Sequence, residues 1–182
     1  MHLIIQPVDE QNFGDVNRCD GAFTIDSRLV LHAANDVIRY TIVSVPPYAK
    51  RYPAEELDYP TYLYHPAKAI FCAYADGQLA GQVIVRKFWN GYAYIDDIVV
   101  DVKFRRLGVG RALVQAVVTW AKDRQLAGVM LETQNNNIAA CRLYESCGFQ
   151  LGGFDRFLYH GLNPDTEEIA LYWYLLFNAV PS

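Results

Sequence analysis

Residues 97–111 read DIVVDVKFRRLGVGR, and this stretch decides the fold. An apolar segment ends at Val100, a cationic turn with two glycines follows, and apolar residues at helical spacing begin at Leu113. The pattern predicts a strand, a turn rich in arginine and glycine, and a helix, in that order. Such a turn is suited to holding a phosphate, because a helix N-terminus carries roughly half a positive charge.

The turn has the chemistry of an anion site but not of the two commonest nucleotide loops. Gly108 and Gly110 lack a Cβ, so the backbone can curl tightly and approach a ligand. A P-loop would need GxxxxGK[ST], which the sequence lacks, and the dinucleotide fingerprint would need a third glycine where Leu113 stands. A surface turn with solvated arginines remains an alternative while the turn is considered alone. Three arginines can add charge-assisted hydrogen bonds to a phosphate: Arg105, Arg106 and Arg111.

Apolar periodicity and turn residues place the surrounding elements. The dipeptides Asp76-Gly77 and Asn90-Gly91 predict type I′ turns, because both central residues of such a turn need positive φ. A helix over 111–125 is expected, with Gly128 left-handed after its end. Asn136 or Asn137 is expected to cap a second helix, which Gly148 ends. The predicted strands are 1–8, 69–74, 79–88, 92–100, 129–133, 149–154 and 169–177, the last apolar on both faces and so central.

Residues 9–68 give weaker signals. Strand-like segments run over 23–31 and 36–45, and Pro46-Pro47 is expected to stop the second. A proline-broken run of tyrosines follows over 48–66. These tyrosines either cover the core from one side or form an aromatic wall for a substrate.

Composition restricts the class of protein. The chain has 182 residues, 52% hydrophobic residues and a net charge of −4, which fits one globular domain and argues against nucleic acid as the main partner. We expect no signal peptide, no membrane helix and no membrane partner. The four cysteines show neither a CxxC pair nor metal-ligand spacing, so reduced thiols, no metal and a cytoplasmic location are expected.

Two blocks in order resemble the GNAT superfamily of acetyl-CoA-dependent N-acetyltransferases. The first is Arg105-Arg106-Leu107-Gly108-Val109-Gly110, which looks like the family's (Q/R)xxGx(G/A) motif. The second runs from Asn137 through Ala140 and Leu143-Tyr144 to Gly148-Phe149, which looks like NxxAxxLYxxxGF. Within the family, Leu131-Glu132-Thr133-Gln134, Ser44-Val45-Pro46-Pro47-Tyr48 and Tyr172-Trp173-Tyr174 are most similar to the streptothricin acetyltransferases, which modify the β-lysine amine of a cationic antibiotic.

The resemblance implies a fold and a co-substrate. The fold would be α+β (α/β in the wider sense), with a mixed, mostly antiparallel central sheet flanked by helices. Strands 94–100 and 129–133, joined through a helix, would be parallel neighbours that splay apart. One N-acetyltransferase domain would span 1–182, with substrate-side elements in 1–68 and the acetyl-CoA-binding core in 69–177. The cofactor-binding residues would be Ile98, Val99, Val100, Arg105, Arg106, Leu107, Gly108, Val109, Gly110, Arg111, Asn137 and Ala140.

The implied reaction needs an acid and a base. Tyr144 would protonate the departing thiolate, although a core tyrosine on the same buried helix face is the alternative. A lysine-like amine has a pKa of about 10.4, so a carboxylate has to take its proton, directly or through water. We favour Asp97 over Asp96, with Glu132 third, and strand alternation is expected to send Asp96 and Asp97 to opposite faces. These acids could equally only attract a cationic substrate or pair with arginines.

The expected function is therefore acetyl transfer from acetyl-CoA to a primary amine of a small cationic molecule, and an antibiotic of the streptothricin type, inactivated for resistance, is one candidate. Acetylation of a protein or peptide amine is an alternative, and a catalytically silent CoA-binding sensor is an alternative of a different class. A homodimer through the apolar segment 172–177 is possible.

Overall fold

The structure is a computed structural model that describes residues 1–53 and 58–177. These residues form two compact units. The first contains residues 1–22, 51–53, 58–129 and 176–177, and the second contains residues 23–50 and 130–175. The prediction of a single domain, with its division at residue 68, stays a prediction. The strands and helices are β1 (Leu3–Pro7), η1 (Phe13–Asp15), β2 (Phe23–Ala34), β3 (Val37–Lys50), η2 (Tyr59–Thr61), β4 (Lys68–Ala75), β5 (Gln78–Lys87), β6 (Ala93–Val100), η3 (Val102–Phe104), α1 (Val109–Asp123), β7 (Gly128–Gln134), α2 (Ile138–Ser146), β8 (Gln150–Asp155) and β9 (Ala170–Leu176).

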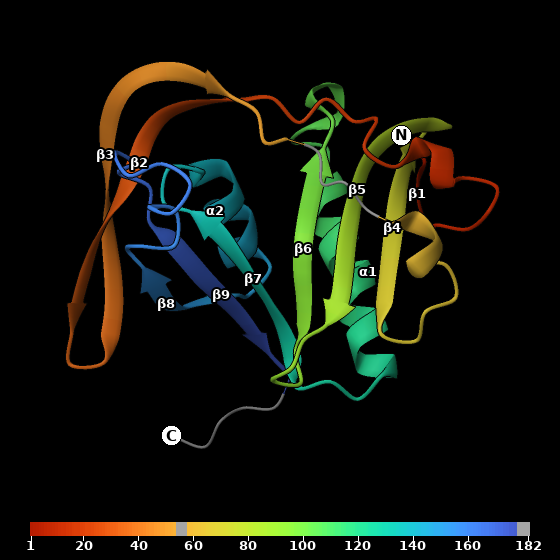
Figure 1. The fold of residues 1–182 in the computed structure, drawn as a ribbon. Helices are drawn as coiled ribbons and strands as arrows, with labels where there is room; N and C mark the ends of the chain where they lie inside the picture. The colour runs from red at the N-terminus through yellow and green to blue at the C-terminus, as the bar shows by residue number, and fades with distance from the viewer. Residues whose placement is uncertain (54–57, 178–182) are drawn as a thin grey trace. The chain divides into compact units, whose positions relative to one another are not determined.

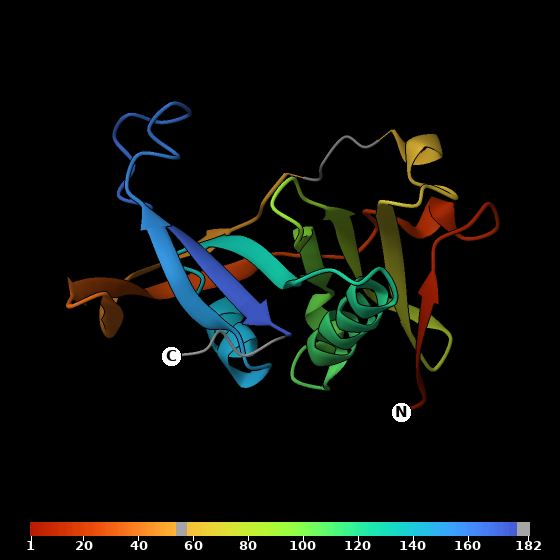
Figure 2. The same ribbon diagram turned by 90° about the horizontal axis from the view of Figure 1, so that it is seen from below.

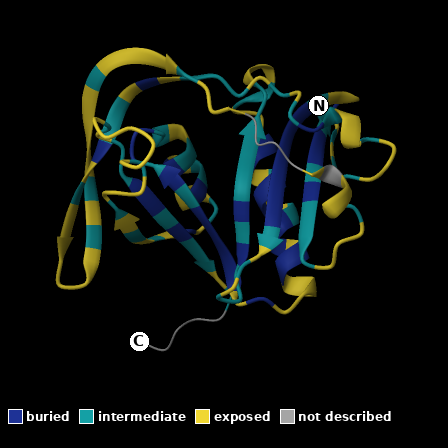
Figure 3. Ribbon diagram, in the orientation of Figure 1, coloured by how far each residue is buried: buried dark blue, intermediate teal, exposed yellow. Residues whose placement is uncertain are grey.

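The first unit contains four antiparallel strands in the order β1-β4-β5-β6. Figure 1 shows these strands side by side, and Figure 2 shows α1 lying along one face of them. The predicted meander β4–β5–β6 is confirmed. Strands β4 and β5 contain much of the core, as the dark colour in Figure 3 shows, because they have neighbours at both edges.

The two predicted hairpin turns differ. Asp76 and Gly77 have φ values of 47° and 80°, so both are left-handed, as a type I′ turn requires. In the second turn only Gly91 has positive φ, at 86°, and the Phe88 N–H donates to the Tyr92 carbonyl at 2.8 Å. The loop therefore has three residues, for which a single left-handed residue at the end suffices. The prediction of a type I′ turn at Asn90-Gly91 is wrong for this reason.

Helix α1 begins and ends two residues earlier than predicted. Its end has the hydrogen bonds of a Schellman motif, since the Leu126 N–H donates to the Ala121 carbonyl at 3.0 Å and the Gln125 N–H donates to the Lys122 carbonyl at 2.9 Å. Gln125 has φ 53° and is the left-handed residue. The prediction that Gly128 has this role is wrong, because Gly128 is already the first residue of β7.

Gly81 lets α1 pack closely on β5. A Cβ at this position would lie 2.7 Å from the Val99 carbonyl oxygen, 3.0 Å from Leu113 Cδ1 and 3.1 Å from Val109 Cγ1. Because the nearest atom is backbone, Gly81→Ala should destabilise the protein by about 1–3 kcal/mol. Denaturant unfolding measures this, and Gly14→Ala is the matched control because a Cβ there meets no atom within 4 Å. Equal stability of the two variants would contradict this packing.

In the second unit the strand order is β7-β9-β8. Strands β8 and β9 are antiparallel. The hydrogen bonds from the Asn135 N–H to the Ile169 carbonyl (2.9 Å) and, between two residues that belong to the first unit, from the Phe177 N–H to the Ala127 carbonyl (3.1 Å) indicate the same for β7 and β9. Strand β9 is therefore central, as predicted. The cap of α2 is Asn137, whose side chain accepts from the Ala140 N–H at 3.2 Å, and Gly148 follows its end with φ 90°.

Strands β2 and β3 form a separate two-stranded antiparallel ribbon in the second unit. Both predicted strands exist, but β3 continues through Pro46-Pro47 to Lys50, so the prediction that these prolines stop it is wrong. The register jumps from Ser27 opposite Ser44 to Ile25 opposite Tyr48, and the prolines fall in this irregular stretch. A proline is tolerated there because no ladder hydrogen bond requires its missing N–H. Much of the ribbon is exposed (Figure 3).

Candidate functional site

The turn before α1 contains two residues in the left-handed backbone conformation. Arg106 has φ 66° and Gly108 has φ 88°, and both are exposed. The Ala112 N–H donates to the Gly108 carbonyl at 3.0 Å and makes the first hydrogen bond of the helix. The N–H groups of Val109 and Gly110 come before Ala112 in the chain, at the N-terminus of α1. Backbone N–H groups at a helix N-terminus point out of the helix and can bind an anion. This geometry suits a phosphate or pyrophosphate.

The segment that leads into this turn is the second half of β6. Ile98, Val99 and Val100 are half-buried and pair with Val83, Gln82 and Gly81 of β5. Arg105 folds back and donates from Nε to the Val100 carbonyl at 3.3 Å. The first unit thus brings together all the predicted cofactor-binding residues from 98 to 111.

A β-bulge corrects the predicted orientation of the two strand acids. The register passes from Ile84 opposite Asp97 to Val85 opposite Ile95, so Asp96 is an extra residue. Cross-strand partners share a face, and so Asp97 lies on the face of Ile84, where Gln82 and Arg86 also lie. The predicted separation of Asp96 and Asp97 to opposite faces is wrong, because each binds a side chain on this face.

The two acids have different partners. Asp96 accepts two hydrogen bonds from Arg86 Nε, at 2.8 and 3.0 Å. Asp97 accepts one hydrogen bond, from Gln82 Nε2 at 3.0 Å. Gln82 is only 1% exposed; its Oε1 accepts from the Asn17 N–H at 2.6 Å, and its Nε2 donates to Asn17 Oδ1 at 2.8 Å. Burial raises the pKa of both carboxyls, and the hydrogen bond from Arg86 or Gln82 opposes the rise. A pKa raised by burial suits a general base, and within residues 1–53 and 58–177 no Lys or Arg forms an ion pair with Asp97.

The remaining predicted site residues belong to the second unit. Tyr144, 4% exposed, packs its ring against Phe149 and Trp173 at centroid distances of 5.8 and 6.3 Å. Asn137 caps the helix that carries Tyr144, with Ala140 as the capped residue. Glu132 of β7 accepts a hydrogen bond from the Tyr159 hydroxyl. Burial raises the pKa of Glu132. The hydrogen bond from Tyr159 lowers this pKa, and the negative charge of Glu168 raises it.

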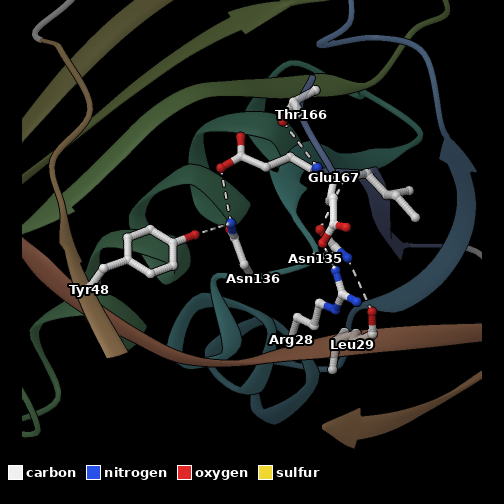
Figure 4. A network of polar contacts seen from close by, with 9 residues as sticks. Arg28, Leu29, Tyr48, Asn135, Asn136, Thr166 and Glu167 are labelled. Carbon is white, nitrogen blue, oxygen red and sulfur yellow. Dashed lines mark hydrogen bonds and ion pairs between the residues drawn. The ribbon is translucent and has the colours of Figure 1, made fainter. Parts of the chain in front are cut away.

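A polar cluster in this unit was not predicted from the sequence. We call it the Glu168 cluster, and it consists of Tyr48, Lys50, Asn136 and Glu168. Lys50 forms an ion pair with Glu168, and Asn136 Nδ2 donates to Glu168 Oε1 at 3.0 Å and to the Tyr48 hydroxyl at 3.3 Å. Figure 4 shows the Tyr48 hydroxyl directed at the Asn136 amide. Next to it, Arg28 pairs with Glu167, and Asn135 Nδ2 donates to the Leu29 carbonyl at 3.1 Å.

Sequence patterns contain few signals for this cluster. Asn136 was a candidate helix cap only, and Lys50 and Glu168 are 118 positions apart. Gln82 was also missed, although a polar residue within the apolar strand 79–88 is a signal that a buried partner needs it.

The described residues contain no cluster of side chains that could hold a metal ion. Within residues 1–53 and 58–177, no three His, Cys, Asp or Glu side chains group closely enough to hold an ion. All four cysteines are free, and burial raises the pKa of Cys72 to about 11. None of the helices in these residues combines the length and apolar character needed to cross a membrane.

Known proteins match this chain over most of its length. The model of the acetyltransferase (GNAT) family matches residues 37–149. Streptothricin acetyltransferase A of Bacillus subtilis is 36% identical over 175 residues, which are 96% of this chain and 100% of that protein. A streptothricin acetyltransferase of Escherichia coli is 37% identical over 144 residues, 79% of each chain.

The comparison with solved structures leads to the same family as the sequence comparisons. A Bacillus anthracis protein described as a putative streptothricin acetyltransferase, solved in complex with acetyl coenzyme A, is 42% identical, with a TM-score of 0.90 over 98% of this chain and 99% of its own. A nourseothricin acetyltransferase is 32% identical, with a TM-score of 0.80 over 97% and 99%. The predicted α+β fold class is confirmed. The chain therefore belongs to the acetyltransferase (GNAT) family and is an acetyl-CoA-dependent N-acetyltransferase.

Proposed function

We propose that this enzyme moves the acetyl group of acetyl-CoA to a primary amine of a small cationic molecule of the streptothricin type. The observation that carries the proposal is the 36% identity to streptothricin acetyltransferase A over 96% of the chain. The half-buried carboxylates Asp97, Glu132 and Glu168 support a cationic acceptor, since each favours a positive charge nearby.

The turn geometry supports the proposed co-substrate site. The N–H groups of Val109 and Gly110, with Arg105, Arg106 and Arg111, are proposed to hold the pyrophosphate, and the backbone of Ile98, Val99 and Val100 the pantetheine arm. Leu107 and Gly108 shape the turn, and Asn137 and Ala140 are proposed to contact the arm. Bound acetyl-CoA supplies the acetyl group as a thioester.

In the proposed mechanism, Asp97 accepts the proton that the acceptor ammonium has to lose, directly or through one water. The neutral amine nitrogen then forms the C–N bond to the acetyl carbon while the C–S bond breaks. A backbone N–H of Val99 or Val100 is proposed to stabilise the negative charge on the acetyl oxygen. Tyr144 gives its hydroxyl proton to the departing sulfur, and the resulting phenolate takes the second proton from the acylated nitrogen, directly or through one water, so that a neutral amide and a free thiol are formed.

Asp97 is preferred over the other two acids on its contacts. Asp96 is neutralised by the two hydrogen bonds from Arg86 and is proposed to position the strand. Glu132 accepts a hydrogen bond from Tyr159 and lies within electrostatic reach of a second carboxylate, Glu168, and the two negative charges together fit attraction of a cation.

A thiol-release assay with acetyl-CoA tests the acceptor. The rate of CoA thiol release is expected to be much higher with streptothricin as acceptor than with lysine or short peptides. Release with peptides alone would instead support acetylation of a protein amine. No release with any amine, together with calorimetric binding of CoA, would support a CoA-binding sensor.

Asp97→Asn should lower kcat/KM by about 10²–10⁴-fold and yet stabilise the protein at neutral pH. Because burial raises the pKa of Asp97 in the folded state, folding favours the protonated form. The stability from this group is full below the unfolded-state pKa and is lost as pH rises through the folded-state pKa. A neutral Asn removes that loss while its carbonyl can still accept from Gln82.

Thermal melts between pH 4 and pH 8 check this prediction. The variant should melt above the wild type at pH 7, and the difference should shrink as pH falls toward 4. A variant that melts below the wild type at pH 7, or one with unchanged kcat/KM, would contradict the assignment of Asp97 as a buried base.

A further inference from the structure

We infer that the Glu168 carboxylate is an ammonium subsite for the acceptor, and that the Lys50 ammonium fills it in this structure. The inference rests on the proposed function, because it concerns how the same cationic acceptor is held. It assigns the cluster a ligand class, a primary alkylammonium, and assigns Lys50 the role of a built-in competitor.

The Glu168 cluster is reachable and yet shielded enough for strong charge interactions. The side chains of Lys50 and Glu168 are 19% and 24% exposed, whereas Glu167 of the neighbouring pair is 79% exposed. Half-buried charges interact more strongly than solvated ones, because water screens them less. A cation arriving at Glu168 is therefore bound more strongly than one at a surface carboxylate.

Asn136, the residue that contacts both Glu168 and Tyr48, adds a buried acceptor atom to the cluster. The residue is 8% exposed, and its side-chain nitrogen already donates to Glu168 and Tyr48. Its Oδ1 is buried and has no hydrogen-bond partner within residues 1–53 and 58–177. A buried acceptor without a donor is unfavourable by about 1–3 kcal/mol. A primary ammonium carries three donors and can satisfy both Glu168 and a neighbouring acceptor.

The cluster lies within electrostatic reach of Glu132, an acid already proposed to attract the acceptor. The charges of Glu168 and Lys50 both act on the carboxyl of Glu132, in opposite directions. An acceptor with two amines, such as one with a β-lysine moiety, can thus place one ammonium at Glu168 and present the other for acetylation.

Lys50 is chemically equivalent to the group that the subsite would bind. It is the last residue of β3 and ends in a primary ammonium on an aliphatic chain. Any alkylammonium that binds Glu168 has to displace it, so Lys50 sets the acceptor affinity by competition. Removing this competitor should tighten acceptor binding, which a purely structural ion pair would not do.

The test compares the steady-state kinetics of the wild-type protein and three variants with streptothricin and acetyl-CoA. Lys50→Met should lower the KM for streptothricin by about 5-fold, and Glu168→Gln should raise it by about 10-fold or more. The KM for acetyl-CoA should stay unchanged in both. Glu167→Gln, which breaks the adjacent pair with Arg28, is the matched control and should leave the KM for streptothricin unchanged.

Thermal shift with streptothricin gives a second measurement without turnover. Relative to each unliganded protein, the stabilisation by streptothricin should be larger in Lys50→Met than in the wild type and nearly absent in Glu168→Gln. A wild type that acetylates streptothricin, with the same KM in all variants, would overturn the inference and leave the proposed function intact. A wild type that neither acetylates streptothricin nor is stabilised by it would overturn both.

Discussion

Tyr144→Phe is expected to lower kcat by about 10²-fold, while the KM for acetyl-CoA stays within about 2-fold of the wild type. The substitution removes only the hydroxyl that we propose as the proton donor. A general acid contributes about 10²–10⁴-fold, and the lower figure applies because a thiol with a pKa of about 8.5 is a fair leaving group as its anion. Stopped-flow or steady-state thiol release measures the rate.

The fold should tolerate this change. The ring of Tyr144 packs against Phe149 and Trp173, and Phe keeps these contacts. Tyr74→Phe is a suitable control, since it removes a phenol hydroxyl that binds Asp15 at 2.7 Å in the first unit. That variant should retain the wild-type rate. A Tyr144→Phe enzyme at full rate would exclude Tyr144 from the mechanism and leave it as a core residue.

Gly108→Val is expected to weaken CoA binding by about 100-fold or more. Gly108 has φ 88°, a conformation that a β-branched residue adopts only with strain, although a Cβ there would meet no atom within 4 Å. The turn should therefore relax and turn its N–H groups away from the pyrophosphate. Hydrogen bonds to charged groups contribute about 1.5–3 kcal/mol each, so the loss of two accounts for the effect.

Gly77→Val is the matched control for strain. Gly77 has φ 80° and an equally open surrounding, but it lies in the hairpin turn between β4 and β5. Both variants should lose a similar amount of stability in chemical denaturation, whereas calorimetry should show a lower CoA affinity for Gly108→Val alone. Unchanged affinity in Gly108→Val would remove the turn from the CoA site.

Local patterns predicted the elements well, because helix and strand periods, caps and turns are properties of neighbouring residues. Asn137 caps the start of α2 and Gly148 follows its end, as expected, and Asp76-Gly77 forms the expected turn. The errors arise where pairing decides the structure. The bulge at Asp96 depends on how β6 aligns with β5, and no residue type at that position requires it.

The same reason explains which parts of the candidate site were missed. The cationic turn before α1 is contiguous in sequence, so its residues could be named in advance. The residues of the Glu168 cluster come from three distant parts of the sequence: the end of β3, Asn136 and the segment before β9. Only the tertiary fold brings them together. Pro46-Pro47 also concealed the length of β3, and with it the position of Lys50.

Asn135 links the ribbon of β2 and β3 to the segment that carries Glu168. Its backbone carbonyl accepts from the Leu29 N–H at 2.8 Å and its side chain binds the Leu29 carbonyl, while its Oδ1 accepts from the Ile169 N–H at 3.0 Å. The side-chain amide thus acts as an additional peptide group that joins β2 to the segment carrying Glu168. The ribbon cannot move away from this segment without breaking these hydrogen bonds. We therefore expect a ligand at the proposed Glu168 subsite to reduce the fluctuations of the ribbon as well.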